Sequence, residues 1–473
     1  MECDPKLLLM IWMKIDRDSD TPIYRQMYEQ LVNRILSGKL KGGDRLPSTR
    51  QFAQDIGVSR NTVTEVYDQL MAEGFIEARA GSGTYVTCGI QIESDLYPGH
   101  PIPAPHEVQV TENKDRIRFL SGVPDAQSFP RNRWFRCLRR ELFYGDVSPT
   151  DYGDVRGWLP LRMELSRYLA NAKNIRCSPD QIFMVTGTSQ ALLLLATYFR
   201  QKLPAVYLED PVIDYVPEIF RQHSYRLFSV PVDRQGMQVN QLKTSEVSGL
   251  VFVTPSHQFP TGSVLPISRR IELIKLARLH KHLIIEDDYD NEFRFGGPPI
   301  QSLHMLDPDR VIHLGTFSKT LGAGLRIGYM VIPSTLCADV YSFKQSMHMS
   351  TTVLDQAILG RFLAKGYFER HVARMKKRYR TKMSCLTRAL KHRFGDRVEV
   401  LGNTAGMHLM VRFRDVVFDA GLKHAIETAH LDIEYLDDYS LSSTKPTESI
   451  ILGYGNLSET QIEEGILRLS RVI

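Results

Sequence analysis

The sequence contains no pair of cysteines spaced like a metal-binding or redox motif. Its six cysteines are scattered along the chain, at Cys3, Cys88, Cys137, Cys177, Cys337 and Cys385. Isolated thiols of this kind are typical of a cytoplasmic protein in which they stay reduced. We therefore expect a cytoplasmic location and no metal site.

Long apolar runs, repeats and a dominant charge are also missing. The apolar stretch near the start, residues 7–13, is far too short to span a bilayer and lacks a signal-peptide cleavage pattern. The formal net charge of +5 permits a nucleic-acid partner but does not indicate one. These absences argue against a membrane protein and leave a globular one.

The length and composition predict a globular chain of two or three domains. The chain has 473 residues, of which 43% are hydrophobic and 24% charged, so a core of normal size is available. Residues 20–87 are dense in helical pattern. Residues 88–116 are rich in proline and polar side chains, which predicts a linker, and from residue 117 short apolar runs alternate with helical patterns.

Residues 46–74 have the pattern of two short helices joined by a tight turn. Ser48 is followed by Gln51 and predicts a helix start, Gly57 ends that helix, and Ser59 caps a second one. The inward positions of the second helix are Val63, Val66, Tyr67 and Leu70. A helix-turn-helix of this kind presents its second helix to the major groove of DNA.

Several exposed positions of this module suit DNA. Arg60, Asn61 and Thr62 open the second helix, where Arg and Asn side chains can pair with base edges. Arg50 is placed for a phosphate contact, and the glycine-rich residues 79–86 predict a hairpin wing. The alternative is an ordinary helical hairpin with solvated charges. The module resembles the winged helix of the GntR family, which implies DNA contacts at Ser48, Arg50, Arg60, Asn61, Thr62 and Gly81.

The rest of the chain predicts a largely buried sheet with helices around it. Six short apolar runs predict buried strands, at residues 182–185, 205–208, 250–253, 283–285, 311–314 and 329–332. From about residue 345 the pattern changes. It predicts one long charged helix over 362–393, strands near 406–413 and 450–453, and a last helix with a capping box at Ser458.

Polar groups suited to one ring-shaped, anionic ligand follow these predicted strands. Lys319 is placed at a strand end, where a lysine can form a Schiff base with an aldehyde, and Arg326 supplies a cation for its phosphate. Asp287 can hold a pyridine nitrogen protonated, and Tyr289 can reach the ring's phenolic oxygen. The remaining candidates are the helix start and hydroxyl groups at Thr188, Ser189, Thr316 and Ser318.

This constellation resembles the fold-type I aminotransferases from Phe119 onward, including their opening motif Tyr152…Gly157…Leu161-Arg162. With the winged helix it resembles the MocR-type regulators. The resemblance implies a multi-domain fold: an α/β winged helix over 20–87, a linker over 88–116, and an α/β aminotransferase-like domain over 117–473. In that domain, a large mixed-sheet part covers about 145–345 and a smaller α+β part about 346–473. It also implies pyridoxal 5'-phosphate as cofactor, double-stranded operator DNA and a small-molecule effector as partners, and a head-to-tail homodimer.

The chain departs from aminotransferases where they hold the substrate carboxylate. Phe259 stands where they usually have Asn, and Asn456 stands where they have a carboxylate-binding Arg. A Tyr and an Arg of the family's GABA-responsive member correspond to Ile213 and Tyr215. These departures favour a regulator that uses its cofactor to sense an effector, either the cofactor itself or an amino compound held by groups such as His257, Tyr215 or Asn456. A true aminotransferase with an accessory DNA-binding domain is the alternative.

Overall fold

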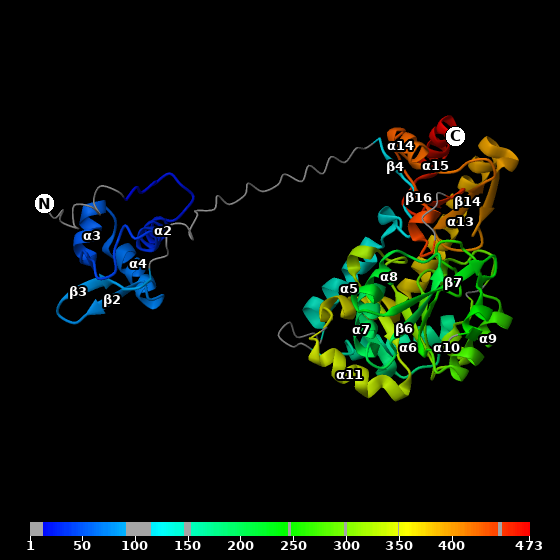
Figure 1. Cartoon of the computed structure of the whole chain (residues 1–473), viewed down its shortest axis with the longest axis horizontal. Coiled ribbons are helices and arrows are strands. Elements are labelled where there is room, and N and C mark those ends of the chain that lie inside the picture. The colour runs from blue at the N-terminus through cyan, green and yellow to red at the C-terminus, as the bar shows by residue number, and fades with distance from the viewer. Residues whose placement is uncertain are drawn as a thin grey trace. The chain divides into compact units, whose positions relative to one another are not determined.

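The computed structural model describes residues 13–90, 115–145, 153–244, 247–297, 300–348, 350–442 and 447–473. The chain divides into two compact units, residues 1–112 and 113–473 (Figure 1). Most of the apolar stretch 7–13, most of the predicted linker 88–116, and Tyr152 lie outside the described residues. Across the described ranges, no helix combines the length and the apolar character needed to cross a membrane.

In its described residues, 13–90, the N-terminal unit consists of three helices and a small antiparallel sheet. Its helices are α2 (Ile23–Leu36), α3 (Thr49–Ile56) and α4 (Arg60–Ala72). Its strands are β1 (Arg45–Leu46), β2 (Ile76–Arg79) and β3 (Gly83–Val86), in the order β1-β3-β2. The hairpin β2–β3 is the predicted wing, and all four predicted inward positions of α4 are buried in the unit's core.

Local side-chain chemistry sets the helix limits of this unit. The Ser48 hydroxyl accepts from the Gln51 N–H, and the Ser59 hydroxyl accepts from the Thr62 N–H, so both predicted caps are confirmed. Gly57 ends α3 with a φ of 67°, a left-handed conformation that glycine adopts without strain. The helix-turn-helix therefore follows from three residues that the sequence already singled out.

Removal of the α4 cap is expected to weaken this helix measurably. The Ser59 hydroxyl lies 3.1 Å from the Thr62 nitrogen, and losing such a cap costs about 1 kcal/mol. Ser59→Ala should therefore increase amide hydrogen exchange in the first turns of α4 roughly fivefold. Ser59→Asp is the control, because aspartate also caps helices and should preserve protection. Equal exchange in Ser59→Ala and the unaltered protein would contradict the role of this cap.

An eight-stranded mixed sheet forms the centre of the second unit. Its order is β5-β12-β11-β10-β9-β6-β7-β8, with β12 antiparallel to both neighbours and β8 antiparallel to β7. The strand bounds are β5 Ile182–Val185, β6 Ala205–Asp210, β7 Arg226–Asp233, β8 Gly236–Met237, β9 Gly249–Val253, β10 Leu283–Asp288, β11 Val311–Thr316 and β12 Gly328–Val331. All six predicted strands are present, and β7 and β8 were not predicted.

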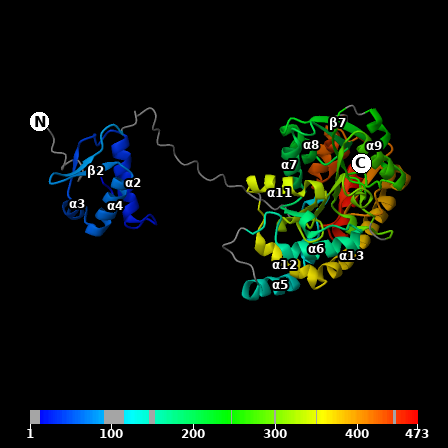
Figure 2. The same ribbon diagram turned by 90° about the horizontal axis from the view of Figure 1, so that it is seen from below.

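Helices cover both faces of this sheet (Figure 2). One layer contains α7 (Thr188–Phe199), α8 (Tyr215–Gln222) and α11 (Cys337–Ser346), which share a core with one side of the strands. The other layer contains α5 (Arg131–Tyr144), α6 (Leu159–Lys173), α9 (Ile267–Leu279) and α10 (Leu303–Leu306). The six predicted strands are buried on both faces, which explains their continuous apolar runs.

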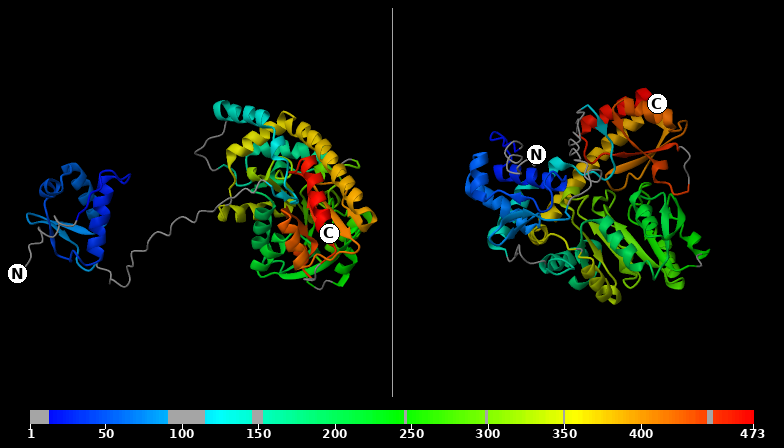
Figure 3. Two further views of the ribbon diagram at one scale, coloured as in Figure 1. Left: turned by 90° about the horizontal axis from the view of Figure 1, so that it is seen from above. Right: turned by 60° about the vertical axis from the view of Figure 1, so that its left-hand side comes forward.

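The C-terminal residues form a smaller α+β lobe, orange to red in Figure 3. Its sheet has the order β13-β14-β17-β16, with bounds β13 Val398–Leu401, β14 His408–Phe413, β16 Glu434–Tyr435 and β17 Ser449–Gly453. Helices α14 (Ala420–Thr428) and α15 (Glu459–Val472) pack beside it, and the capping box at Ser458 is confirmed. β4 (Ile117–Arg118) pairs with β15 (Leu431–Asp432), so the start of the second unit joins this lobe.

The single long helix predicted over residues 362–393 is wrong at its beginning. The structure has two helices there, α12 (Val353–Ala364) and α13 (Tyr367–Phe394), and Gly366 separates them. Gly366 has a φ of 60°, which breaks the helical hydrogen-bond ladder. The charged pattern of α13 masked this break in the sequence.

Candidate functional site

The predicted DNA-binding residues lie on the N-terminal unit. Arg60 and Asn61 are exposed at the start of α4, Arg50 is exposed on α3, and Gly81 is exposed at the tip of the wing. Ser48 is exposed, and its hydroxyl caps α3. Their chemistry suits base edges and phosphate oxygens.

Two contacts among the residues of α4 and the wing were not predicted from the sequence. The Thr62 hydroxyl lies 2.8 Å from the Ser59 hydroxyl, so Thr62 also contributes to the cap of α4. On the wing, the Arg79 guanidinium lies 4.5 Å from the centre of the Tyr85 ring and forms an ion pair with Glu77. These contacts hold the Arg79 side chain against the hairpin.

A cavity at the carboxyl ends of the parallel strands is the main site of the second unit. All eight predicted cofactor residues line it: Thr188, Ser189, Asp287, Tyr289, Thr316, Ser318, Lys319 and Arg326. The other lining residues are Ser121, Gly122, Gly187, Ile213, Tyr215, Thr254, Phe259, Ala323 and His408. Ligands of α/β sheets bind at this edge, so the placement agrees with the reasoning from strand ends.

Lys319 lies in the loop that follows β11, which ends at Thr316, and its amine points at the backbone of Gly122. The Lys319 Nζ donates to the Gly122 carbonyl at 3.0 Å. Burial lowers the pKa of Lys319, although the carboxylates of Asp290 and Asp287 oppose that effect. A lowered pKa increases the fraction of neutral, nucleophilic amine. A Cβ at Gly122 would lie 2.3 Å from the Nζ, so a side chain there would displace the amine from this position.

Four carboxylates lie on β10 or two residues beyond its end, and three of them are paired with a buried histidine or lysine. Glu286 lies 3.1 Å from His313, Asp288 lies 2.7 Å from Lys173, and Asp290 lies 2.9 Å from His257. The Ser256 hydroxyl also donates to Asp288. The strand is therefore held by paired charges on either side of Asp287.

Asp287 is the exception in this group. Its Oδ1 is buried and has no hydrogen-bond partner among the described residues. Burial, with the neighbouring Asp288 carboxylate, raises the pKa of Asp287 to about 7, although the Lys319 amine opposes this effect. A buried acceptor without a partner is costly, and a protonated ring nitrogen in the cavity would satisfy it. The residues present thus fit the pyridine ring of pyridoxal phosphate.

The other end of the cavity suits a phosphate. Helix α7 begins at Thr188, directly after Gly187, so its first N–H groups face the cavity. Arg326 lies beside Gly187, because a Cβ at Gly187 would be 3.3 Å from an Nη of the guanidinium. The hydroxyl of Thr316 accepts from the Ser318 N–H at 3.1 Å, which shapes the loop that leads to Lys319.

Tyr289 is held by a buried support that the sequence did not reveal. Its hydroxyl donates to the His257 carbonyl at 2.9 Å and lies 3.2 Å from the His257 Nδ1. Burial, with the Asp290 carboxylate, holds the pKa of Tyr289 well above its usual value. His257, Asp290 and His408 bring possible ligand atoms within 4.8 Å of one another. Since His257 already pairs with Asp290, and the His408 Nε2 lies 3.2 Å from the Pro260 carbonyl, we interpret them as hydrogen-bonded support.

The structure separates the three candidate effector residues. Tyr215 lines the cavity, and its hydroxyl is hydrogen-bonded to Ser189. His257 is buried behind Tyr289 and is not among the lining residues. The Asn456 amide donates to the Arg118 carbonyl at 3.3 Å, and Asn456 does not line the cavity either. Of the three, only Tyr215 is placed to touch a ligand directly.

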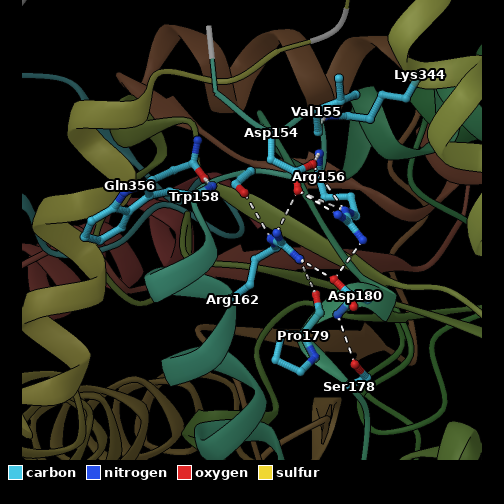
Figure 4. A network of polar contacts seen from close by, with 11 residues as sticks. Asp154, Val155, Arg156, Trp158, Arg162, Ser178, Pro179, Asp180, Lys344 and Gln356 are labelled. Atoms are coloured by element: carbon cyan, nitrogen blue, oxygen red, sulfur yellow. Dashed lines mark hydrogen bonds and ion pairs between the residues drawn. The ribbon is translucent and has the colours of Figure 1, made fainter. Parts of the chain in front are cut away.

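The Gly157…Arg162 motif has a structural explanation (Figure 4). The Arg162 side chain is 1% exposed, donates to the Gly157 carbonyl at 3.0 Å, and pairs with Asp154 and Asp180. The buried Lys344 amine donates to the Val155 carbonyl. The Arg162 bonds anchor the segment 153–157 to the start of α6, and the Lys344 bond anchors it to α11.

Comparison with known proteins agrees with this division of the chain. The family described as "Bacterial regulatory proteins, gntR family" matches residues 23–86, and "Aminotransferase class I and II" matches residues 142–433. The chain is 33% identical to the "Probable rhizopine catabolism regulatory protein MocR" of Rhizobium meliloti, over 96% of this chain and 94% of that protein. It is 29% identical to the "HTH-type pyridoxine biosynthesis transcriptional regulator PdxR" of Corynebacterium glutamicum, over 96% of each.

Among solved structures, the chain is similar to the multiple substrate aminotransferase of Thermococcus profundus. The TM-score is 0.70 and the identity 26%, over 76% of this chain and 92% of that one. The match covers an aminotransferase fold without the additional N-terminal unit. The regulators named above match nearly the whole of this chain.

Proposed function

Because this chain belongs to the MocR-type subfamily of GntR-family transcription regulators, we propose that pyridoxal 5'-phosphate held at Lys319 governs its binding to operator DNA. The protein is a transcription regulator with an aminotransferase-like domain. In this proposal the winged helix over residues 20–87 reads the operator through the candidate residues on α3, α4 and the wing. The protein acts in the cytoplasm as a head-to-tail homodimer, and each winged helix packs on the partner's large domain.

The observation that carries this proposal is a buried carboxylate, without a partner in the described part of the chain, in the same cavity as a lysine. Asp287 has a buried oxygen without a partner among the described residues, and the Lys319 amine bonds only a carbonyl there. When bound, the cofactor supplies an aldehyde that captures amines and a ring that withdraws electrons. The protein's part is to orient that ring, hold its phosphate with Arg326, and keep Asp287 as the base beside its nitrogen.

An aminotransferase is the second candidate function, and the cavity argues against it. Among the residues that line the cavity, Arg326 is the only one with a guanidinium, and the phosphate end uses it. Phe259 lines the cavity where an asparagine is usual, and Tyr215 stands where the GABA-responsive relative has its Arg. A substrate carboxylate would therefore meet no charged, two-pronged partner, which amino-acid transamination needs.

Loading the protein with cofactor is expected to change its affinity for DNA. A ligand shifts the equilibrium between two conformations of a regulator only by the difference in its affinity for them. If the cofactor prefers the conformation that binds DNA, or the one that does not, apo and holo protein should bind the operator differently. The measurement is a titration of apo and loaded protein against a duplex enriched from a random pool by the unaltered protein. A difference of roughly 5–150-fold in affinity is expected, the usual range for coupling between two sites. Identical affinities would reject cofactor sensing.

A further inference from the structure

Two helices of the second unit carry much of the positive charge of the chain. Helix α5 has five arginines and one glutamate, and α13 has ten lysines and arginines and one glutamate. Together they hold fifteen of the 59 Lys and Arg residues of the chain but only two of its 54 Asp and Glu residues. Because the whole chain has a net charge of only +5, the rest of it is net acidic. The positive charge is therefore concentrated on these two helices.

The two helices meet at the ring of Tyr367, which three arginines surround. The guanidinium carbons of Arg133 and Arg136 on α5 lie 5.5 and 5.7 Å from the centre of this ring. That of Arg370 on α13 lies 5.1 Å from the same centre. The glutamate of α5, Glu141, is engaged by an ion pair with α12 instead. The ring attracts each cation, but the three like charges repel one another, so an anionic partner would stabilise this cluster.

From this cluster a row of cations follows the length of α13. Its members are all exposed and recur at spacings that bring them to one face of the helix: Arg370, Arg374, Lys377, Arg388 and Lys391, named the α13 row below. At 1.5 Å per residue this row is about 32 Å long. One turn of B-DNA has nearly the same length, about 34–36 Å. Open hollows lie near both ends of the row, one bordered by Arg374 and the other by Arg388 and Lys391.

We propose that the α13 row and the arginines around Tyr367 bind the phosphate backbone of the DNA beside the bases that the winged helix reads. Guanidinium groups match phosphate oxygens with two hydrogen bonds at a time, and a straight row of cations suits a long, regular polyanion. Contacts with phosphates add affinity without sequence preference. Because both DNA-binding surfaces belong to one chain, DNA held by the winged helix is at a high effective concentration for the second. This inference rests on DNA binding by the winged helix and not on cofactor sensing.

The double variant Arg370→Gln/Lys377→Gln removes two charges of the α13 row and keeps polar side chains in their place. The full-length protein is titrated, over a series of salt concentrations, against a selected operator duplex with further DNA on both sides. We expect the slope of log affinity against log salt concentration to become less steep by about 2, because each phosphate contact releases about one counterion. The affinities for the operator and for a random duplex should fall by the same factor. The matched double variant Lys281→Gln/Arg414→Gln removes two exposed charges outside α5 and α13 and should leave the slope unchanged.

Chemical modification of arginines tests the same surface in the unaltered protein. Phenylglyoxal is applied with and without the operator duplex, and peptide masses report which arginines react. The duplex should protect Arg374 and Arg388 but not Arg414, which is exposed on the C-terminal lobe. Equal salt slopes in the two double variants, or equal reaction of Arg388 with and without DNA, would overturn the inference. A change of sedimenting mass in Arg370→Gln/Lys377→Gln with an unchanged salt slope would also overturn it, because the surface would then bind a second copy of the chain.

Discussion

Lys319→Ala is expected to abolish the yellow colour of the cofactor-loaded protein. Lys319 is the only lysine among the residues that line the cavity, and its amine donates to the Gly122 carbonyl. Without it no Schiff base can form, and the ring keeps only its contacts with Asp287 and with the phosphate end. The measurement is the visible absorption of purified protein after incubation with pyridoxal phosphate and gel filtration.

Two variants make this result specific. Lys275→Ala removes an exposed lysine from α9 and should keep the full absorption. Asp287→Asn keeps Lys319 but removes the carboxylate beside the ring nitrogen, so it should retain the covalent link while changing the shape of the spectrum. An unaltered protein that stays colourless with added cofactor would contradict the assignment of Lys319.

Much of the sheet and of the helix-turn-helix could be predicted because the signals are local. The six predicted strands are buried on both faces, so each is a continuous apolar run that stands out from its surroundings. The caps at Ser48 and Ser59 depend on residues three positions apart. The cofactor residues follow strand ends, and parallel strands end at one edge of the sheet.

The strand β7 escaped prediction because its environment is mixed. Its residues alternate between exposed, half-buried and buried positions, and Pro231 interrupts the apolar pattern. Similarly, the break at Gly366 lies between two segments with good helical patterns. Single glycines inside helices are tolerated often enough that the sequence does not reveal which one ends a helix.

Contacts between segments that lie far apart in the sequence could not be predicted at all. Glu434 meets Ser121 across 313 positions of sequence, and nothing near either residue indicates the other. His257 and Asn456 were chosen as effector residues because they stand in or near the motifs. The structure instead directs His257 at Asp290 and Tyr289, and Asn456 at the Arg118 carbonyl. Proximity in a motif does not fix the direction of a side chain.

Arg60→Ala is expected to weaken binding to a selected operator duplex by roughly 1–3 kcal/mol. This is the usual loss for a residue that makes two hydrogen bonds to the edge of one base. Arg60 is exposed in the first turn of α4, at the end of the helix that enters the major groove in proteins of this kind. Titration at one fixed salt concentration gives the affinity for the operator and for a random duplex. Because a base contact matters only for the right sequence, Arg60→Ala should reduce the ratio of the two affinities.

Arg50→Ala on α3 is the matched control, because it removes the same charge from the same unit. As a phosphate contact, Arg50 should contribute equally to both duplexes, so its loss should lower both affinities and leave their ratio unchanged. Its loss should also reduce the slope of log affinity against log salt concentration by about 1, because about one fewer counterion is released on binding. If Arg60→Ala and Asn61→Ala both leave the ratio unchanged, α4 is not the helix that reads the operator, and the wing around Gly81 becomes the next surface to test.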